Sequence, residues 1–147
     1  MGGPMAMNLI KAGHSVRALD LVPALLADVV EQGAQPGESP AHTVQHADVV
    51  ISMLPSAGAV TGLYLGDGGI LNQISADAII IDCSTIDAQT AKRVAQAAAD
   101  AGRRMIDAPG SGGVAGAAAG TLTCICGVGG ERVEGGGPIC SASGKNY

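Results

Sequence analysis

The sequence has almost no aromatic side chains: its 147 residues include two tyrosines and neither tryptophan nor phenylalanine. A hydrophobic fraction of 47% with 14% charged residues is nevertheless typical of a globular protein. The core must therefore be built from Ala, Val, Ile, Leu and Met, so each helix contributes only modest apolar burial. At this length a single domain is expected.

Further absences narrow the class of protein. No apolar run approaches the roughly 18 residues that a membrane helix needs, and the first residues show no secretion signal. The net charge is -5 and there is no basic stripe, which argues against nucleic acid as a partner. We therefore expect neither a membrane nor a nucleic-acid partner. The expected location is the cytoplasm, or the mitochondrion if a transit peptide was lost with the N-terminus.

The cysteines lack the paired spacing of a zinc site. They are Cys83, Cys124, Cys126 and Cys140. We expect reduced structural thiols and no metal site, with metal binding or a disulfide as the less favoured alternatives.

Helix-like and strand-like segments alternate along the chain. The predicted helices are residues 4–12, 23–32, 41–47, 57–65 and 87–101, and the predicted strands are residues 15–20, 48–54, 78–82, 104–108 and 122–126. Residues 35–40 are predicted to be a turn-rich connector. Such alternation predicts an α/β fold with a mainly parallel sheet that helices cover on both faces.

The chain opens on Met1-Gly2-Gly3-Pro4, directly before a predicted helix, and the next predicted strand closes at Asp20. A helix start, a helix, a strand and an acidic residue form the back half of a dinucleotide-binding unit. Free N–H groups at the helix start would face a pyrophosphate. A carboxylate at Asp20 would accept hydrogen bonds from an adenosine ribose and repel a 2′-phosphate, which favours NAD over NADP. A solvated aspartate and an ordinary helix start are the alternatives.

Chemically distinctive residues follow the other predicted strands, at residues 53–56, 82–85 and 107–113. Ligands of open parallel sheets bind beyond the carboxyl ends of the strands, so these residues would meet along one edge. Ser84 and Thr85 would offer hydroxyls there, or would belong to an ordinary cap of the helix near Asp87. Ser111 and the glycines after it would suit a small carboxylate, or would form a flexible loop.

Together these segments resemble the β-hydroxyacid dehydrogenase family. The family's loop runs Gly-Leu-Gly-x-Met-Gly-x-Pro-Met-Ala-x-Asn-Leu, and residues 1–9 match it from the methionine onward. The other matching motifs are Lys-Ala-Gly-His at 11–14, Met-Leu-Pro at 53–55, Asp-Cys-Ser-Thr-Ile at 82–86, Asp-Ala-Pro at 107–109, Ser-Gly-Gly-Val at 111–114 and Gly-Thr-Leu-Thr at 120–123. The resemblance covers residues 1–126 or so.

The resemblance implies a Rossmann-like doubly wound fold with NAD as cofactor. The implied cofactor-binding residues are Met1 and Gly2 at the pyrophosphate, Asp20 at the adenosine ribose, and Leu54, Pro55 and Thr85 at the nicotinamide half. The implied substrate-binding residues are Ser111, Gly112 and Gly113, which would hold the carboxylate of a small β-hydroxyacid. The implied reaction is the oxidation of 3-hydroxyisobutyrate to methylmalonate semialdehyde, a step of valine catabolism. A tartronate-semialdehyde (2-hydroxy-3-oxopropionate) reductase and a non-catalytic NAD-binding module remain alternatives.

The resemblance also implies parts that these 147 residues do not contain. We expect the first strand of the fold, which lies at the centre of the sheet, to be missing, leaving two strand edges unpaired. The family's catalytic lysine and C-terminal helical domain would lie beyond the C-terminus, so no residue receives a catalytic role. We therefore expect a partial dinucleotide-binding domain at residues 1–127, a glycine-rich degenerate tail at 128–147, and a chain truncated at both ends that is inactive alone. The parent enzyme would be a homo-oligomer.

Overall fold

A computed structural model describes residues 2–111, 122–124 and 144–146 of the chain. The helices are α1 (Gly2–Lys11), α2 (Pro23–Glu31), α3 (Pro40–Val44), α4 (Ala57–Leu65), the 3-10 helix η1 (Ile70–Gln73) and α5 (Ala88–Asp100). The strands are β1 (Arg17–Ala18), β2 (Gln35–Pro36), β3 (Val49–Ser52), β4 (Ile79–Asp82), β5 (Arg104–Asp107), β6 (Gly110–Ser111), β7 (Leu122–Cys124) and β8 (Gly144–Asn146).

The first five strands alternate with helices and form parallel sheets, which confirms the predicted Rossmann-like α/β fold. β1 pairs with β2, and β3, β4 and β5 pair in that order. In a third, small sheet β7 pairs with β6 in the antiparallel direction and with β8 in the parallel direction. No helix within the described ranges is long and apolar enough to cross a membrane.

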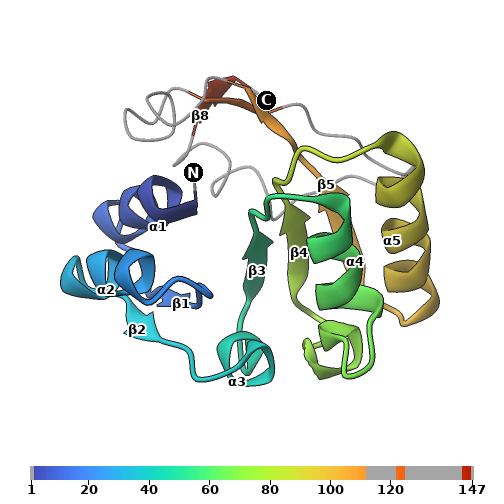
Figure 1. Ribbon diagram of the computed structural model, residues 1–147, viewed down its shortest axis with the longest axis horizontal. Helices are drawn as coiled ribbons and strands as arrows, with labels where there is room; N and C mark the ends of the chain where they lie inside the picture. The colour runs from blue at the N-terminus through green and yellow to red at the C-terminus, as the bar shows by residue number, and fades with distance from the viewer. Residues whose placement is uncertain (1, 112–121, 125–143, 147) are drawn as a thin grey trace.

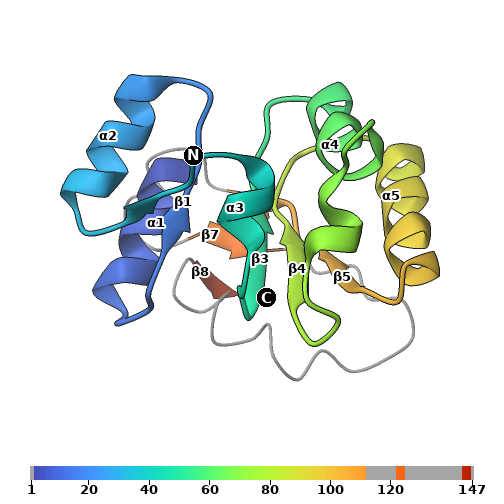
Figure 2. The same ribbon diagram turned by 90° about the horizontal axis from the view of Figure 1, so that it is seen from below.

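The sheet is divided between β1 and β3. β1 and β2 form one hydrogen-bonded sheet, and β3, β4 and β5 form another. Within each of these two sheets the strands are parallel. Figure 1 shows β1 and β2 with α1 and α2 at the left, and β3, β4 and β5 with α4 and α5 at the right. Seen from below, α3 lies between these two groups (Figure 2). The division falls where the sequence predicted that a central strand is missing.

The core lies on both faces of the three-stranded sheet. β4 is buried at every position, as expected of a strand with neighbours on both sides. On one face, Val50 and Ile80 pack with Val60 of α4 and Val94 of α5. Strand side chains alternate between faces, so the residues next to these turn the other way. On that second face Ile79, Ile81 and Ile106 pack against Met5 of α1.

Local signals explain where the helices begin. Asp87 is the N-cap of α5: its carboxylate accepts hydrogen bonds from the Thr90 backbone N–H at 2.8 Å and the Thr90 hydroxyl at 2.7 Å. Those bonds lower the pKa of Asp87, with the backbone bond from Thr90 as the largest cause. Ser56 caps α4 by accepting from the Ala59 N–H. Gly102, just past α5, has φ of +72°, a left-handed conformation that suits glycine.

Several details differ from the predicted elements. The connector at residues 35–40 contains β2, a two-residue edge strand whose proline and short length hide any alternation. The strand predicted at 15–20 is only β1, because pairing with so short a partner ends after two residues. η1 was not predicted, since four residues show no helical period. The predicted tail at 128–147 lies outside the described residues except for β8, where no element was predicted.

Candidate functional site

The carboxyl ends of the three central strands lie side by side. Ser52 of β3 pairs with Asp82 of β4, and Asp82 pairs with Asp107 of β5, each the last residue of its strand. The residues that follow these strands, 53–56, 83–86 and 108–109, therefore share one edge, which we call the carboxyl edge. The sequence predicted this convergence.

The start of α1 lies at the carboxyl edge. A Cβ placed on Gly2 would lie 3.7 Å from Cβ of Met53, which follows β3. The N–H groups of the first helical turn have no partner within the helix, so they can receive an anion. Gly2 is thus close to the segment that contains Leu54 and Pro55. Met1, the other residue predicted at the pyrophosphate, lies outside the described residues.

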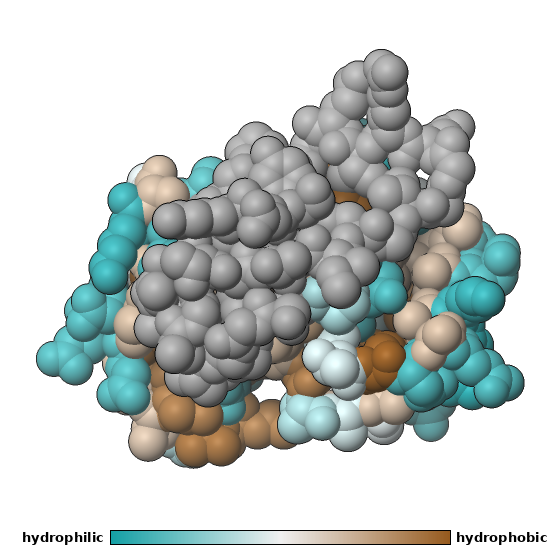
Figure 3. All heavy atoms as spheres, turned by 90° about the horizontal axis from the view of Figure 1, so that it is seen from above, coloured by the Kyte–Doolittle hydropathy of each residue, from teal (hydrophilic) through white to brown (hydrophobic). Residues whose placement is uncertain are grey.

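Asp20 follows the end of β1 and is exposed. α1 starts at the carboxyl edge and leads away from it, and β1 returns, so Asp20 faces the same side as that edge. Its Oδ1 accepts a hydrogen bond of 2.8 Å from the Val22 N–H, which fixes the direction of the carboxylate. Leu21 is 96% exposed and Val22 is 49% exposed, so apolar surface flanks this carboxylate. Viewed from above, the molecule shows apolar surface at the lower left beside hydrophilic surface (Figure 3).

The residues predicted at the nicotinamide half lie along the carboxyl edge. Leu54 is half-buried, while Pro55 and Thr85 are exposed. The hydroxyl of Ser84, which the sequence also placed at this edge, is not presented there, because Ser84 is fully buried. Asp87 rather than Ser84 or Thr85 caps α5. Thr85 therefore remains the accessible hydroxyl of this pair.

Sequence reasoning missed a buried polar chain beneath the carboxyl edge. The Tyr64 hydroxyl of α4 donates to Ser52 Oγ at 2.7 Å, and Ser52 Oγ donates to Asp82 Oδ1 at 2.8 Å. The Ser84 hydroxyl donates to the same Oδ1 at 2.6 Å, and the Ser84 N–H does so at 3.1 Å. Burial raises the pKa of Tyr64 well above its ordinary value, against the lowering effect of the Ser52 bond. The one sequence feature that could have indicated this buried polar chain is Ser52, a polar residue inside an otherwise apolar strand.

Asp107 ends β5 directly beside Asp82. Burial raises the pKa of the Asp107 carboxyl, and the negative charge of Asp82 raises it further. The shift marks the end of β5 as a place where added negative charge is unfavourable.

The residues predicted to bind the substrate carboxylate are only partly described. Ser111 belongs to β6 and its backbone pairs with Thr123 of β7. Gly112 and Gly113 lie outside the described residues.

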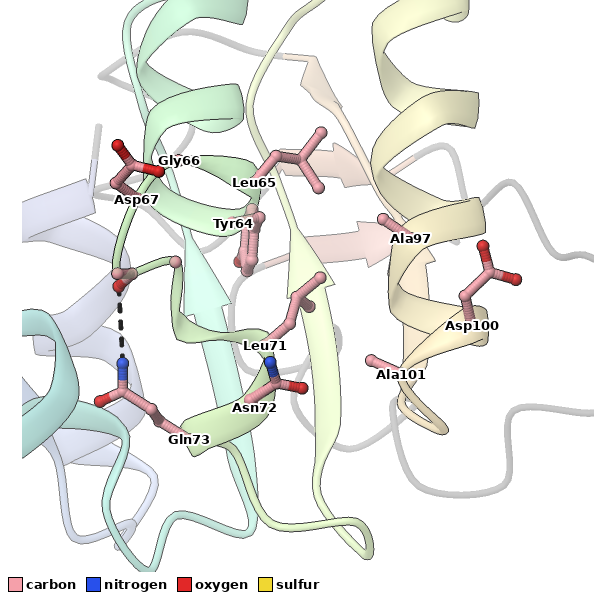
Figure 4. Close-up of a pocket in the computed structure, with 12 residues that line it drawn as sticks. Tyr64, Leu65, Gly66, Asp67, Leu71, Asn72, Gln73, Ala97, Asp100 and Ala101 are labelled. Carbon is pink, nitrogen blue, oxygen red and sulfur yellow. Dashed lines mark hydrogen bonds between the residues drawn. The ribbon is translucent and has the colours of Figure 1, made fainter.

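One hollow on the described part of the molecule lies away from the carboxyl edge. It measures about 750 Å³ and is lined by the end of α4, by η1 and by the end of α5. Both helices lead away from the carboxyl edge, so the hollow lies at the opposite end of the sheet. Figure 4 shows Asp67 and Asp100 on its two sides and the Gln73 amide bonded to the Gly68 carbonyl. Among the described residues no cluster of His, Cys, Asp and Glu could hold a metal ion.

Comparison with known families gives the class of the domain. The family described as the NAD binding domain of 6-phosphogluconate dehydrogenase matches residues 1–147. The chain belongs to this family. The Rossmann-like fold and NAD, the cofactor predicted from the sequence, are thereby confirmed for this NAD-binding domain.

Its relatives include dehydrogenases of small hydroxyacids. The NAD-binding domain is 49% identical over 146 residues to 3-hydroxyisobutyrate dehydrogenase of Pseudomonas aeruginosa. It is 47% identical over 146 residues to the NAD-dependent L-serine dehydrogenase of that organism. Each match covers 99% of this chain and 49% of the relative. The predicted resemblance to β-hydroxyacid dehydrogenases is confirmed.

A solved structure agrees with the fold. 3-hydroxyisobutyrate dehydrogenase of Mycobacterium tuberculosis with L-serine matches at a TM-score of 0.93 and 35% identity, over 99% of this chain and 49% of that one. The chain spans about half the length of the curated relatives it matches.

Proposed function

We propose that this chain holds NAD along its carboxyl edge and supplies the cofactor half of a dehydrogenase of small β-hydroxyacids. The observation that carries the proposal is the gathering of the α1 start, Asp20, Leu54-Pro55 and Thr85 on one side of the sheets. In open parallel sheets this side receives dinucleotides.

Each part of the edge suits one part of the cofactor. The first N–H groups of α1, beginning at Gly2 and with Met1 before it, would hold the pyrophosphate. Asp20 would accept from the ribose hydroxyls through the oxygen that Val22 does not engage. Leu54, Pro55 and Thr85 would lie against the nicotinamide and exclude water from one side of it. Bound there, NAD would supply the hydride acceptor for the carbon that carries the substrate hydroxyl.

The substrate we propose first is 3-hydroxyisobutyrate, oxidised to methylmalonate semialdehyde, with its carboxylate held by Ser111, Gly112 and Gly113. The relatives support the class of small hydroxyacid, but their identities of 49% and 47% do not separate 3-hydroxyisobutyrate from L-serine. Tartronate semialdehyde is the further candidate. We propose a cytoplasmic location and a homo-oligomeric whole enzyme.

We expect little or no turnover from the 147 residues alone. Removing a hydride from the hydroxyl carbon requires a group that takes the hydroxyl proton. Lys11 lies in the last turn of α1, away from the carboxyl edge, and Lys92 is exposed on α5. The side chain of Lys145 in β8 lies outside the described residues.

The proposal is tested by calorimetric titration of the purified chain with NADH, followed by assays with NAD and each of 3-hydroxyisobutyrate and L-serine. The expected result is saturable binding weaker than micromolar and no measurable NADH formation. A folded chain that binds neither NADH nor ADP-ribose would overturn the proposed cofactor site. Measurable NADH formation by the 147 residues alone would contradict our expectation that they lack a group to take the hydroxyl proton.

A further inference from the structure

The buried polar chain beneath the carboxyl edge ends on a backbone group of that edge. The Leu54 N–H donates to Ser84 Oγ at 2.8 Å. The last backbone bond between β3 and β4 in this region is from Cys83 N–H to the Ser52 carbonyl. Leu54 lies beyond that bond, where the two strands stop pairing. The Ser84 side chain therefore continues the connection between the strands by two residues.

Each hydrogen bond in this buried polar chain has a defined donor and acceptor. The Tyr64 hydroxyl donates a hydrogen bond to Ser52 Oγ, and the Ser52 hydroxyl donates one to Asp82 Oδ1. The Ser84 hydroxyl also donates its hydrogen bond to Asp82, so Ser84 Oγ acts as the acceptor of the Leu54 N–H. The carboxylate thus fixes the rotamer of Ser84, and Ser84 fixes the position of the Leu54 backbone. Tyr64 can reach Ser52 from the last turn of α4 because helical side chains tilt toward the helix N-terminus.

Stability alone does not account for this arrangement. Tyr64, Ser52, Asp82 and Ser84 are each at most 5% exposed, and all three donors to the Asp82 carboxylate are neutral groups. Burying a carboxylate costs desolvation energy that its hydrogen bonds largely offset, so well-packed apolar residues would stabilise the core as well. What apolar residues could not supply is a fixed acceptor for the Leu54 N–H.

We propose that Ser84, oriented by Asp82, is a positioning residue that holds Leu54 and Pro55 against the nicotinamide half of the cofactor. The inference rests on the proposed function, since it assigns a purpose to the nicotinamide end of that site. Ser84 itself is buried and touches no ligand. Its effect is confined to the segment after β3, so the adenosine end at Asp20 is independent of it.

The test compares two ligands that share the adenosine end. NADH contains the nicotinamide and ADP-ribose lacks it, so a defect at Leu54 weakens binding of NADH only. Dissociation constants are measured by NMR titration for the unaltered chain, Ser84→Ala, Tyr64→Phe and Val94→Ala. Val94 is fully buried on α5 and is not part of the polar chain, so Val94→Ala is a matched control for general destabilisation.

Ser84→Ala is expected to weaken NADH binding by about tenfold, the equivalent of one hydrogen bond, and to change ADP-ribose binding less than about twofold. Tyr64→Phe is expected to weaken NADH binding by about threefold. If Ser84→Ala does not fold, Tyr64→Phe serves as the test of the positioning role. Val94→Ala should leave the ratio of the two constants unchanged. Equal weakening of both ligands, or no weakening of either, would overturn the positioning role. Failure of the unaltered chain to bind either ligand would overturn the proposed function and this inference with it.

Discussion

Asp82 and Asp107 occupy paired positions at the carboxyl ends of neighbouring parallel strands, so two carboxyl groups lie side by side. Asp82 accepts hydrogen bonds from Ser52 and Ser84. For Asp107 the structure instead gives burial and the nearby charge of Asp82, both of which raise its pKa. The two carboxyl groups therefore differ in their surroundings, and ionisation of Asp107 opposes folding.

Asp107→Asn should flatten the dependence of stability on pH. Since the pKa of Asp107 is raised in the folded chain, the folded state binds more protons than the unfolded state at pH above the ordinary value of 3.8. Stability from this group is thus full below that value and is lost as pH rises through the raised pKa. Urea unfolding from pH 3.5 to pH 8 should show a smaller fall for Asp107→Asn. Asp67→Asn, at an exposed position, serves as control; identical profiles for Asp107→Asn and the unaltered chain would contradict the prediction.

Asp20→Asn should weaken the preference for NADH over NADPH. Asparagine keeps an oxygen that can accept from the Val22 N–H, so the substitution removes the charge and preserves the turn. Hydrogen bonds to charged groups contribute about 1.5–3 kcal/mol, so we expect at least about tenfold weaker NADH binding. NADPH binding should not weaken, because repulsion of the 2′-phosphate is removed as well. Competition titrations measure both, with Asp28→Asn on exposed α2 as control; parallel losses for the two cofactors would argue against Asp20 as the ribose acceptor.

Ile80→Ala should destabilise the chain by about 2–5 kcal/mol, because it leaves a cavity in the layer between β4 and helices α4 and α5. Ile80 is fully buried in the central strand of its sheet. Leu25→Ala, at a side chain that is 52% exposed, should change stability by less than about 0.5 kcal/mol. Denaturant unfolding monitored by circular dichroism measures both. A small loss for Ile80→Ala would mean that the β3-β4-β5 sheet is not the centre of the core.

An added strand before Gly2 should stabilise the chain. β1 and β3 are edge strands of two separate sheets, and α1, which begins beside Met53, is placed to follow a strand between them. A Val- and Ile-rich extension of about five residues, joined through glycines, would span a strand of ordinary length. We expect a higher urea midpoint and a larger m-value, because more surface becomes buried. A Gly/Ser extension of equal length is the control, and equal midpoints for the two would contradict the prediction.

Some of the helices were predictable from the sequence. α4 has the predicted bounds, and Asp87 caps α5 as expected, because both depend on local signals. β2 was not predictable, since Gln35 and Pro36 are exposed and form a strand only through their pairing with β1. Such short edge strands depend on a partner rather than on a pattern of their own.

The location of the site was predictable from strand ends, but the state of its side chains was not. Ser84 and Thr85 are adjacent in the sequence and equally hydroxylated, yet Ser84 is buried under Asp82 and Thr85 is exposed. Which of the two turns inward depends on the strand alternation continuing past β4, and on Tyr64 and Ser52 supplying the rest of the polar chain. These contacts join residues far apart in the sequence, which no local spacing encodes.

The central claim, that NAD binds along the carboxyl edge, is tested most directly by mapping NADH binding onto the backbone amides of the ¹⁵N-labelled chain. We predict concentration-dependent shifts of the amides of Gly3, Asp20, Leu54 and Thr85. Shifts confined to the hollow beside Asp67, Gln73 and Asp100, or no shifts in a folded chain, would contradict the account.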